Sequence, residues 1–358
     1  MSFNSYGDRI TVTLFGESHG KSFGAVLDGL EAGVEIDTEF INSQMEKRRA
    51  KGKISTKRNE ADKVNIVSGV FDGKTTGTPI TVIIENEDTK SKDYSKMKSL
   101  ARPSHADYTG FIKYKGFNDY RGGGHFSGRI TAPLVAVGAI LIKYLMSRGI
   151  YICTHILECG GIRDREFNNL DEDYKKLSRC EFAVLDNIAE EKMKKKIEEA
   201  ALEGDSVGGI LQTAIFGLPA GVGDPWFDNF EGVLAKGLFS IPGIKGVEFG
   251  AGFDFARMKG SQANDPFVVE NSAVKTLTNN NGGINGGITN GMPVIVNCAV
   301  KPTPSIYKEQ STIDFANMEN TNIKIEGRHD PAIIHRARVV ADSVTAISVC
   351  DMLYKGNL

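Results

Sequence analysis

The chain has 358 residues, of which 41% are hydrophobic and 25% are charged, and its net charge is −2 at pH 7. These values are ordinary for a globular protein and exclude a wholly disordered chain. The balanced charge also argues against a dedicated nucleic-acid-binding or membrane-binding protein. Glycine is abundant, at 40 residues without a collagen period, so we expect tight turns and close approaches of the backbone to a ligand.

The first nine residues are polar and lack the apolar core of a signal peptide. The longest apolar run, residues 132–142, is too short to cross a bilayer. No linker or repeat is visible, so we expect one large domain covering residues 1–358 of a cytoplasmic protein. Five cysteines without a C-x-x-C pair predict buried, reduced thiols: Cys153, Cys159, Cys180, Cys298 and Cys350.

In chain order, residues 9–15 predict a strand, because β-branched residues alternate there before the segment GESHG. Residues 131–148 predict a helix, because apolar residues recur at helical spacing; Thr131 is expected to cap it and Gly149 to end it. Strands and helices mixed without a regular β-α-β alternation predict an α+β fold. Further strands are expected at residues 64–70, 80–84 and 293–300, and further helices at residues 190–203 and 342–354.

Residues 47–58 hold seven cations and no acid. No aromatic residue interrupts this run, as stacking on a single-stranded nucleic acid would require. The run therefore favours a site for a small polyanion, because arginine offers bidentate hydrogen bonds to phosphate and carboxylate. A solvated loop is the alternative. The cations are Lys47, Arg48, Arg49, Lys51, Lys53, Lys57 and Arg58.

A second candidate anion site is the segment DYRGGGHFSGRIT, residues 119–131. Three glycines precede the expected helix, whose N-terminal N–H groups and dipole attract anions, and Arg121 and Arg129 add positive charge. A purely structural turn is the alternative. The segment is not a dinucleotide-binding fingerprint, because Ser127 stands where the last glycine should be.

Three of the six histidines lie in polar motifs: His19 in GESHG, His105 in RPSHAD and His329 in GRHDP. Imidazole is the usual proton donor or acceptor near neutral pH, so these are candidate catalytic groups, with packed structural histidines as the alternative. The sequence has no H-x-x-x-H pair and no Cys/His cluster, so we expect no metal site.

Three further glycine motifs need interpretation. Residues 279–291, NNNGGINGGITNG, form either a surface loop or a backbone cradle for a cofactor. Residues 16–20 fit the G-x-S-x-G of serine hydrolases, but they lie too early in the chain, and the segment after them is expected to be extended rather than helical. Residues 69–75 look like a phosphate-binding loop with one residue too few between the glycines, which argues against a kinase.

Taken together, these motifs resemble the chorismate synthase family, in the family's order and along nearly the whole chain. The resemblance implies a single-domain β-α-β sandwich that uses reduced FMN, without net redox change. It also implies the conversion of 5-enolpyruvylshikimate 3-phosphate to chorismate by 1,4-anti elimination of phosphate and a ring hydrogen. A non-catalytic protein that binds small polyanions or RNA is the alternative. The matching segments are residues 15–20, 48–58, 68–80, 102–109, 119–131, 240–250, 282–291, 301–306 and 327–331.

The resemblance also implies roles for particular residues. His19 would donate a proton to the leaving phosphate, His105 would protonate the reduced flavin near N1, and Asp330 would take the ring proton near flavin N5. Substrate contacts are implied for Ser18, Arg48, Arg49, Arg102, Ser127, Arg129 and Arg328. FMN contacts are implied for His125, Phe126, Ser127, Pro242, Gly243, Gly286, Lys301, Pro302, Thr303, Pro304, Ser305 and Arg328.

NADPH is a candidate reductant that would dock on Arg48 and Lys53. The expected partners are three further copies in a homotetramer and an external flavin reductase, with no nucleic acid and no membrane. The chain departs from the common family form at Ser104, where the family has glycine, and at His125 and Phe126, where it has Arg-Ser. We expect the reaction to be retained despite these changes. The contacts to FMN are expected to differ at these positions, where His125 would replace only part of the function of the family's arginine.

Overall fold

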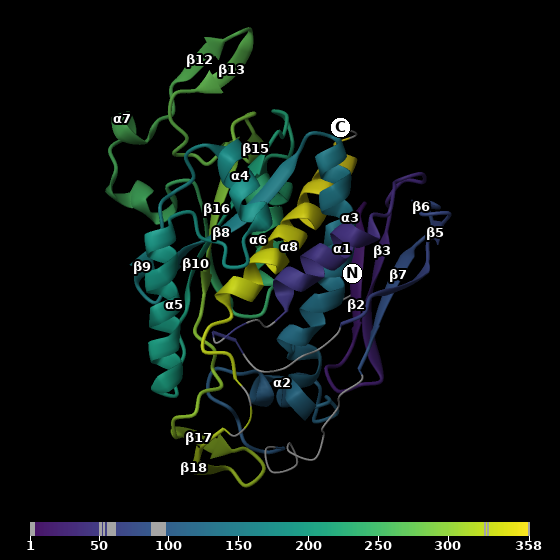
Figure 1. The fold of residues 1–358 in the computed structure, drawn as a ribbon, viewed down its shortest axis with the longest axis vertical. Helices are drawn as coiled ribbons and strands as arrows, with labels where there is room; N and C mark the ends of the chain where they lie inside the picture. The colour runs from purple at the N-terminus through teal and green to yellow at the C-terminus, as the bar shows by residue number, and fades with distance from the viewer. Residues whose placement is uncertain are drawn as a thin grey trace.

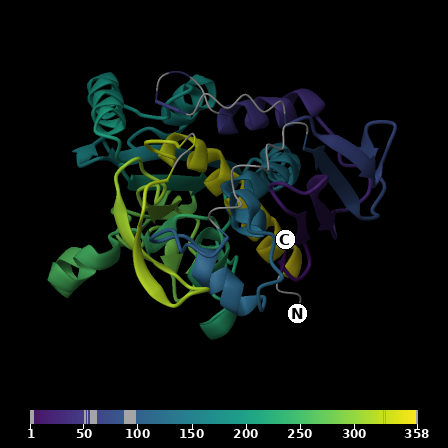
Figure 2. The ribbon, with the colours of Figure 1, turned by 90° about the horizontal axis from the view of Figure 1, so that it is seen from below.

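A computed structural model describes residues 4–49, 52, 54–55, 62–86, 98–325, 327 and 329–356. Two five-stranded antiparallel sheets lie on either side of a layer of helices (Figure 1). Seen from below, the helices again separate the two sheets (Figure 2). This arrangement agrees with the α+β class predicted from the residue pattern and with the β-α-β sandwich that the family resemblance implies.

The first sheet has the strand order β1-β2-β3-β7-β4. Its inner face buries Val12, Phe23, Ala25, Leu27 and Val82 against the helices. The strands expected at residues 9–15, 64–70 and 80–84 are present, with ends that differ by one to two residues. The bounds are β1 Ser5–Tyr6, β2 Thr11–Gly16, β3 Ser22–Asp28, β7 Ile80–Glu85 and β4 Asn65–Ser68.

The second sheet has the strand order β11-β16-β10-β8-β9. Helices α4 Leu170–Arg179 and α5 Asn187–Leu202 lie beside its β8–β9 side (Figure 1). Helix α5 begins three residues before the expected start, because Asp186 caps it by accepting from the N–H groups of Ile188 and Ala189. The bounds are β11 Ile244–Phe249, β16 Val294–Val300, β10 Gly209–Phe216, β8 Tyr151–Cys159 and β9 Ile162–Arg163.

The helix layer is built on α3 Thr131–Ser147 and α8 Ile334–Lys355, which pack against each other. Both are buried along almost their whole length, which suits a helix that lies between two sheets. Gly138 allows their close approach, because a Cβ there would lie 2.3 Å from the Cβ of Ser343. Helices α1 Thr38–Arg48 and α6 Phe230–Phe239 complete the layer.

Two expectations about these helices are wrong. Thr131 does not cap α3: Ser127 accepts from Arg129 N–H and caps the 3-10 turn η3 Gly128–Ile130, while the Thr131 hydroxyl donates to Gly128 O. Helix α8 begins eight residues before the predicted position. Polar and charged residues at its start, such as His335 and Arg338, break the apolar pattern, yet both are buried.

One helix, Gly128–Ser147, is long and apolar enough to cross a membrane by length and composition alone. Of its apolar window, 78% is buried inside the protein, as expected of a core helix. The five cysteines are free; Cys180 is only partly buried, unlike the other four, which corrects the expectation that all are buried.

The remaining elements are short. Hairpin β17–β18, Gln310–Asp314 with Glu319–Ile323, pairs with the chain near Ala101: the Ala101 N–H donates to Ile313 O and the Phe315 N–H donates to Ser99 O. It therefore holds the segment that carries His105. Others are β5 Val70–Phe71, β6 Lys74–Thr75, α2 Asp107–Lys113, η2 Arg121–Phe126, η4 Trp226–Asp228, η5 Gly252–Arg257, α7 Gly260–Ala263, β12 Phe267–Glu270, β13 Ala273–Thr276, β14 Ile284–Asn285 and β15 Ile288–Thr289.

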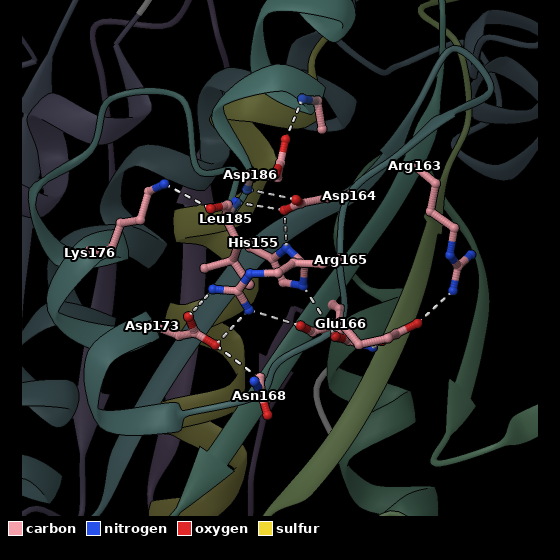
Figure 3. Close-up of polar contacts among 12 residues, drawn as sticks. His155, Arg163, Asp164, Arg165, Glu166, Asn168, Asp173, Lys176, Leu185 and Asp186 are labelled. Atoms are coloured by element: carbon pink, nitrogen blue, oxygen red, sulfur yellow. Dashed lines mark hydrogen bonds and ion pairs between the residues drawn. The ribbon is translucent and has the colours of Figure 1, made fainter.

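A row of polar side chains crosses the outer face of the second sheet. His155, Gln212, Asn297 and Glu248 stand opposite one another on β8, β10, β16 and β11, and each hydrogen-bonds to the next. At the β8 end of the row, Asp164 lies 3.0 Å from His155 Nδ1 (Figure 3). His155 and Gln212 are buried and Asn297 and Glu248 partly buried, and because every member has a partner, the row ties four strands together.

Candidate active site

A cavity of about 550 Å³ lies between the C-terminal end of α1, the N-terminal ends of α3 and α8, and the loop after β16. Its size suits a small-molecule ligand. The structure brings together at its wall most of the residues implied by the family resemblance: Arg48, Arg49, His105, Phe126, Ser127, Arg129, Pro242, Gly243, Lys301, Pro302, Thr303, Pro304, Ser305 and Asp330.

Several implied residues do not line this cavity. Arg102 lines a neighbouring cavity of about 30 Å³, room for about one water molecule, which shares His105 and Phe126 with the large one. Gly286 lies in the β14–β15 hairpin, outside both cavities. Ser18, His19 and His125 lie outside the lining of both cavities as well. Arg328 and Lys53 lie outside the described residues.

The triple-glycine turn holds the two candidate catalytic imidazoles. Gly122, Gly123 and Gly124 all have positive φ, and Gly124 has a φ/ψ of 53° and −127°, which side chains do not tolerate. A Cβ on Gly122 would lie 2.1 Å from His19 Cε1, and a Cβ on Gly123 would lie 3.4 Å from His105 Cε1. The turn can therefore pass as close as it does to His19 only because Gly122 has no side chain, whereas a Cβ on Gly123 would make ordinary contact with His105.

The GESHG segment is docked on the same turn. The Ser18 N–H donates to Gly124 O at 3.1 Å, and the Ser18 hydroxyl donates to Arg121 O at 3.2 Å. His125 Nδ1 lies 2.8 Å from Gly16 O. Ser18 is buried, and β3 rather than a helix follows the segment, so the expectation that an extended segment follows GESHG is confirmed.

His105 forms a compact cluster with Arg102 and Asp107. Its Nδ1 lies 2.9 Å from Asp107 Oδ1 and 3.0 Å from Arg102 Nη2. Asp107 also accepts from the Nε and Nη2 of Arg102, at 2.8 and 2.6 Å. Burial alone would raise the pKa of Asp107, but the hydrogen bonds from Arg102 and His105 outweigh it and hold that pKa well below its usual range. Two of the three side-chain nitrogens of Arg102 are thus engaged inside the protein.

The arginines at the N-terminal end of α3 are held by one carboxylate. Asp62 bonds to Arg48 Nη1 at 3.0 Å and to Arg129 Nη1 at 2.8 Å. Arg48 also donates to Thr131 Oγ1 and to Gly128 O, so all three of its nitrogens are used within the protein. Asp62 is buried with a φ of 41°, a conformation in which a side chain is uncommon.

The opposite wall joins the loop after β16 to α8. Lys301 Nζ donates to Ser104 O at 2.5 Å, and Asp330 forms a 2.6 Å ion pair with Arg336. Burial, together with the neighbouring Lys245, lowers the pKa of Lys301. Ser104, which replaces a glycine of the common family form, keeps a φ of 57°, in the left-handed region that favours glycine.

Among the described residues that line the cavity, five cations face three carboxylates, so the wall has a net positive charge suited to an anionic ligand. The cations are Arg48, Arg49, Arg129, Lys301 and Arg336, and the carboxylates are Glu46, Asp62 and Asp330.

The wall also has features that fit a flavin mononucleotide. Apolar residues such as Ile241, Pro242 and Ile333 form a surface for a planar ring, next to cations for a phosphate. The Thr303 hydroxyl is buried and has no hydrogen-bond partner among the described residues, which leaves a polar atom for a bound molecule.

Sequence reasoning did not single out Asp62, Asp107 or Arg336 as residues of the site. Asp107 had a signal, because it stands two residues after His105 within RPSHAD. Asp62 and Arg336 had none, because they approach the site from segments that show no motif of their own.

Comparison with known proteins agrees with this geometry. The sequence model of the family described as chorismate synthase matches residues 10–354. A chorismate synthase from Dehalococcoides mccartyi is 44% identical over 356 residues, covering 99% of this chain and 98% of the relative. One from Pyrococcus abyssi is 46% identical over 347 residues, covering 97% and 96%.

A crystal structure of chorismate synthase matches with a TM-score of 0.73 and 30% identity, covering 98% of this chain and 93% of that chain. The expected α+β fold and the expected family are thus confirmed. The chain belongs to the chorismate synthase family.

Proposed function

We propose that this chain converts 5-enolpyruvylshikimate 3-phosphate to chorismate, as a lyase of aromatic amino-acid biosynthesis. One observation carries the proposal: a single cavity, in a chain that matches the family over its whole length, gathers His105, Asp330 and five cations. The alternative, a non-catalytic polyanion-binding or RNA-binding protein, finds no support among relatives that carry an enzyme's name.

The cations account for binding of the substrate. A phosphate and two carboxylates need several positive partners, and Arg49, Arg129 and Lys301 provide them around the cavity. Arg48 acts chiefly by holding Asp62 and the first turns of α3. As the phosphate leaves, its negative charge grows, and fixed cations in a confined site stabilise that charge.

The protons have defined acceptors and donors. Asp330 takes the ring proton, with Arg336 holding its carboxylate in place at 2.6 Å. On the family resemblance, His19 gives a proton to the leaving phosphate, although it lies next to Gly122 of the triple-glycine turn and outside the cavity lining; His105, next to Gly123 of the same turn, acts at the cavity wall. Loss of phosphate with one ring proton leaves a new double bond and needs no net oxidant.

Reduced FMN is the proposed cofactor, supplying an electron-rich ring beside the substrate. Phe126, Pro242, Gly243, Thr303 and Ser305 would hold it, because they combine apolar surface with hydroxyl groups at the cavity wall. His125 faces the backbone of Gly16 rather than the cavity, so it does not take the place of an arginine toward FMN.

We further propose a cytoplasmic homotetramer that is supplied with reduced flavin by an external reductase, with NADPH as the alternative reductant. Hairpin β12–β13 projects from the body of the protein (Figure 1) and exposes Phe267, Val269 and Val274. A two-stranded hairpin is marginal in water, so packing on another copy would stabilise it. Sedimentation of the purified protein tests this state.

The activity test is anaerobic. The protein is mixed with 5-enolpyruvylshikimate 3-phosphate and FMN, with dithionite, with NADPH or with neither, and chorismate and phosphate are followed together. Equal amounts of both products with dithionite support the proposal, and product with NADPH shows that the enzyme reduces its own flavin. Binding of substrate without products under every condition would contradict it. His19→Ala and His105→Ala should each lower kcat by about 10²–10⁴-fold.

A further inference from the structure

We propose that Asp107 is a positioning residue for the reaction: it keeps a proton on His105 Nδ1 and so leaves Nε2 as the nitrogen that exchanges protons in the cavity. The inference rests on the proposed function, because it concerns how His105 acts in that reaction. Neither the family resemblance nor the comparisons assign a role to Asp107.

The carboxylate of Asp107 accepts three hydrogen bonds from Arg102. Its Oδ2 accepts from the backbone N–H and the Nε of Arg102, at 2.9 and 2.8 Å, and its Oδ1 accepts from Arg102 Nη2 at 2.6 Å. The same Oδ1 lies 2.9 Å from His105 Nδ1. All three side chains are largely buried, with 10–18% of each exposed. The ring is therefore held at Nδ1 by a fixed partner.

Asp107 and Arg102 have opposite effects on whether His105 Nδ1 carries a proton. A carboxylate only accepts hydrogen bonds, so Asp107 Oδ1 favours a proton on Nδ1. A guanidinium only donates, so Arg102 Nη2, 3.0 Å away, favours an unprotonated Nδ1. Because Asp107 already accepts from Arg102, its charge satisfies the guanidinium and leaves the proton on the ring. Without that charge, Arg102 would donate to Nδ1 and the proton would move to Nε2.

The other side of the ring is available for chemistry. His105 lines both the large and the small cavity, and no described residue is hydrogen-bonded to its Nε2. Gly123 lies beside this edge, where a Cβ would come into contact with Nε2 at 3.5 Å. With Nδ1 carrying its proton, Nε2 of the neutral ring accepts a proton and Nε2 of the charged ring donates one.

The test is Asp107→Asn, studied by ¹⁵N NMR of the histidine side chains and by the pH dependence of kcat. The His105 signals are identified by their loss in His105→Gln. We expect a proton on Nδ1 in the wild-type ring at alkaline pH and on Nε2 in the variant. We also expect kcat to fall about 10–100-fold with little change in KM, and the limb of the pH profile that depends on His105 to move.

Two further variants separate positioning from folding. Asp173→Asn removes a comparable ion pair with Arg165 (Figure 3). Neither residue lines either cavity, so this variant should leave the tautomer and kcat unchanged. Asp107→Glu keeps a carboxylate, so its His105 ring should carry the Nδ1 proton as in the wild type. This variant tests the inference even if Asp107→Asn does not fold. A folded Asp107→Asn with the wild-type tautomer and pH profile, or a folded Asp107→Glu without the Nδ1 proton, would overturn the inference. A wild-type protein with the Nδ1 proton but no chorismate formation would instead refute the proposed function.

Discussion

Gly122→Ala tests whether the triple-glycine turn positions His19. The new Cβ would lie 2.1 Å from His19 Cε1, about 1.3 Å short of the 3.4 Å at which ordinary contact begins. The ring must therefore move by more than 1 Å, or the turn must shift away from it. An alanine at a φ of +58° also costs roughly 1 kcal/mol of folding free energy.

The expected result is a folded enzyme with kcat about 10²-fold lower, because a displacement of about 1 Å in a proton donor costs about that much. The assay follows chorismate and phosphate anaerobically with reduced FMN. Gly123→Ala meets His105 only at 3.4 Å, so we expect a smaller loss.

The control is Gly33→Ala, which also has a positive φ, of +90°, but no atom within 4 Å of the new Cβ. It should lose at least as much stability as Gly122→Ala loses from backbone strain alone, because its φ lies further from the left-handed minimum, and it should keep its activity. A folded Gly122→Ala with the kcat of Gly33→Ala would show that the turn does not position His19 for the reaction.

Two other predictions concern buried charges. Asp62→Asn removes the carboxylate between Arg48 and Arg129, so the KM for the substrate should rise about tenfold, with a smaller change in kcat; an unchanged KM would contradict this bridging role. Burial raises the pKa of Asp342 to about 6 and lowers the pKa of His335 to about 4. Asp342 therefore stabilises the fold below pH 3.8 and loses that contribution as the pH rises through 6, whereas His335 contributes above pH 6.5 and loses its contribution as the pH falls through 4. In the wild type, the two effects should largely cancel, so the free energy of unfolding in urea should change little between pH 4 and pH 6. In Asp342→Asn it should rise with pH through the remaining effect of His335, and in His335→Gln it should fall with pH through the remaining effect of Asp342. Parallel pH profiles for all three proteins would contradict this prediction.

Apolar periodicity predicted the central helix well. Helix α3 ends within one residue of its predicted end, because an uninterrupted apolar pattern is a local property of the chain. Helix α8 shows the limit of such reasoning. Arg338 at its start is 2% exposed, and its guanidinium donates to Leu177 O and Cys180 O, about 160 residues earlier in the chain. No local pattern could indicate that these distant carbonyls would satisfy the charge.

The motifs likewise predicted the kinds of residue at the site but not their partners. Arg48 was expected to face the substrate, yet it is bound to Asp62, which belongs to no recognised motif. Gly286 was expected beside FMN, yet it lies in a hairpin outside the cavity. His105 lines the candidate cavity, and Asp107 stands in the same motif, but only the structure shows that the Asp107 carboxylate lies 2.9 Å from His105 Nδ1.

The sequence by itself determined the family, the α+β class and the residue types of the site, because these depend on motifs and periodicities that are local and survive in order along the chain. Only the tertiary structure decided which charged side chains are paired inside the protein and which face the cavity. Ion pairing depends on distances between segments that can lie far apart in sequence, such as those of Asp62 and Arg129. The Arg48 guanidinium, with all three nitrogens hydrogen-bonded inside the protein, is less available to a ligand than Lys301 at the cavity wall, and that difference is set by packing rather than by the order of residues.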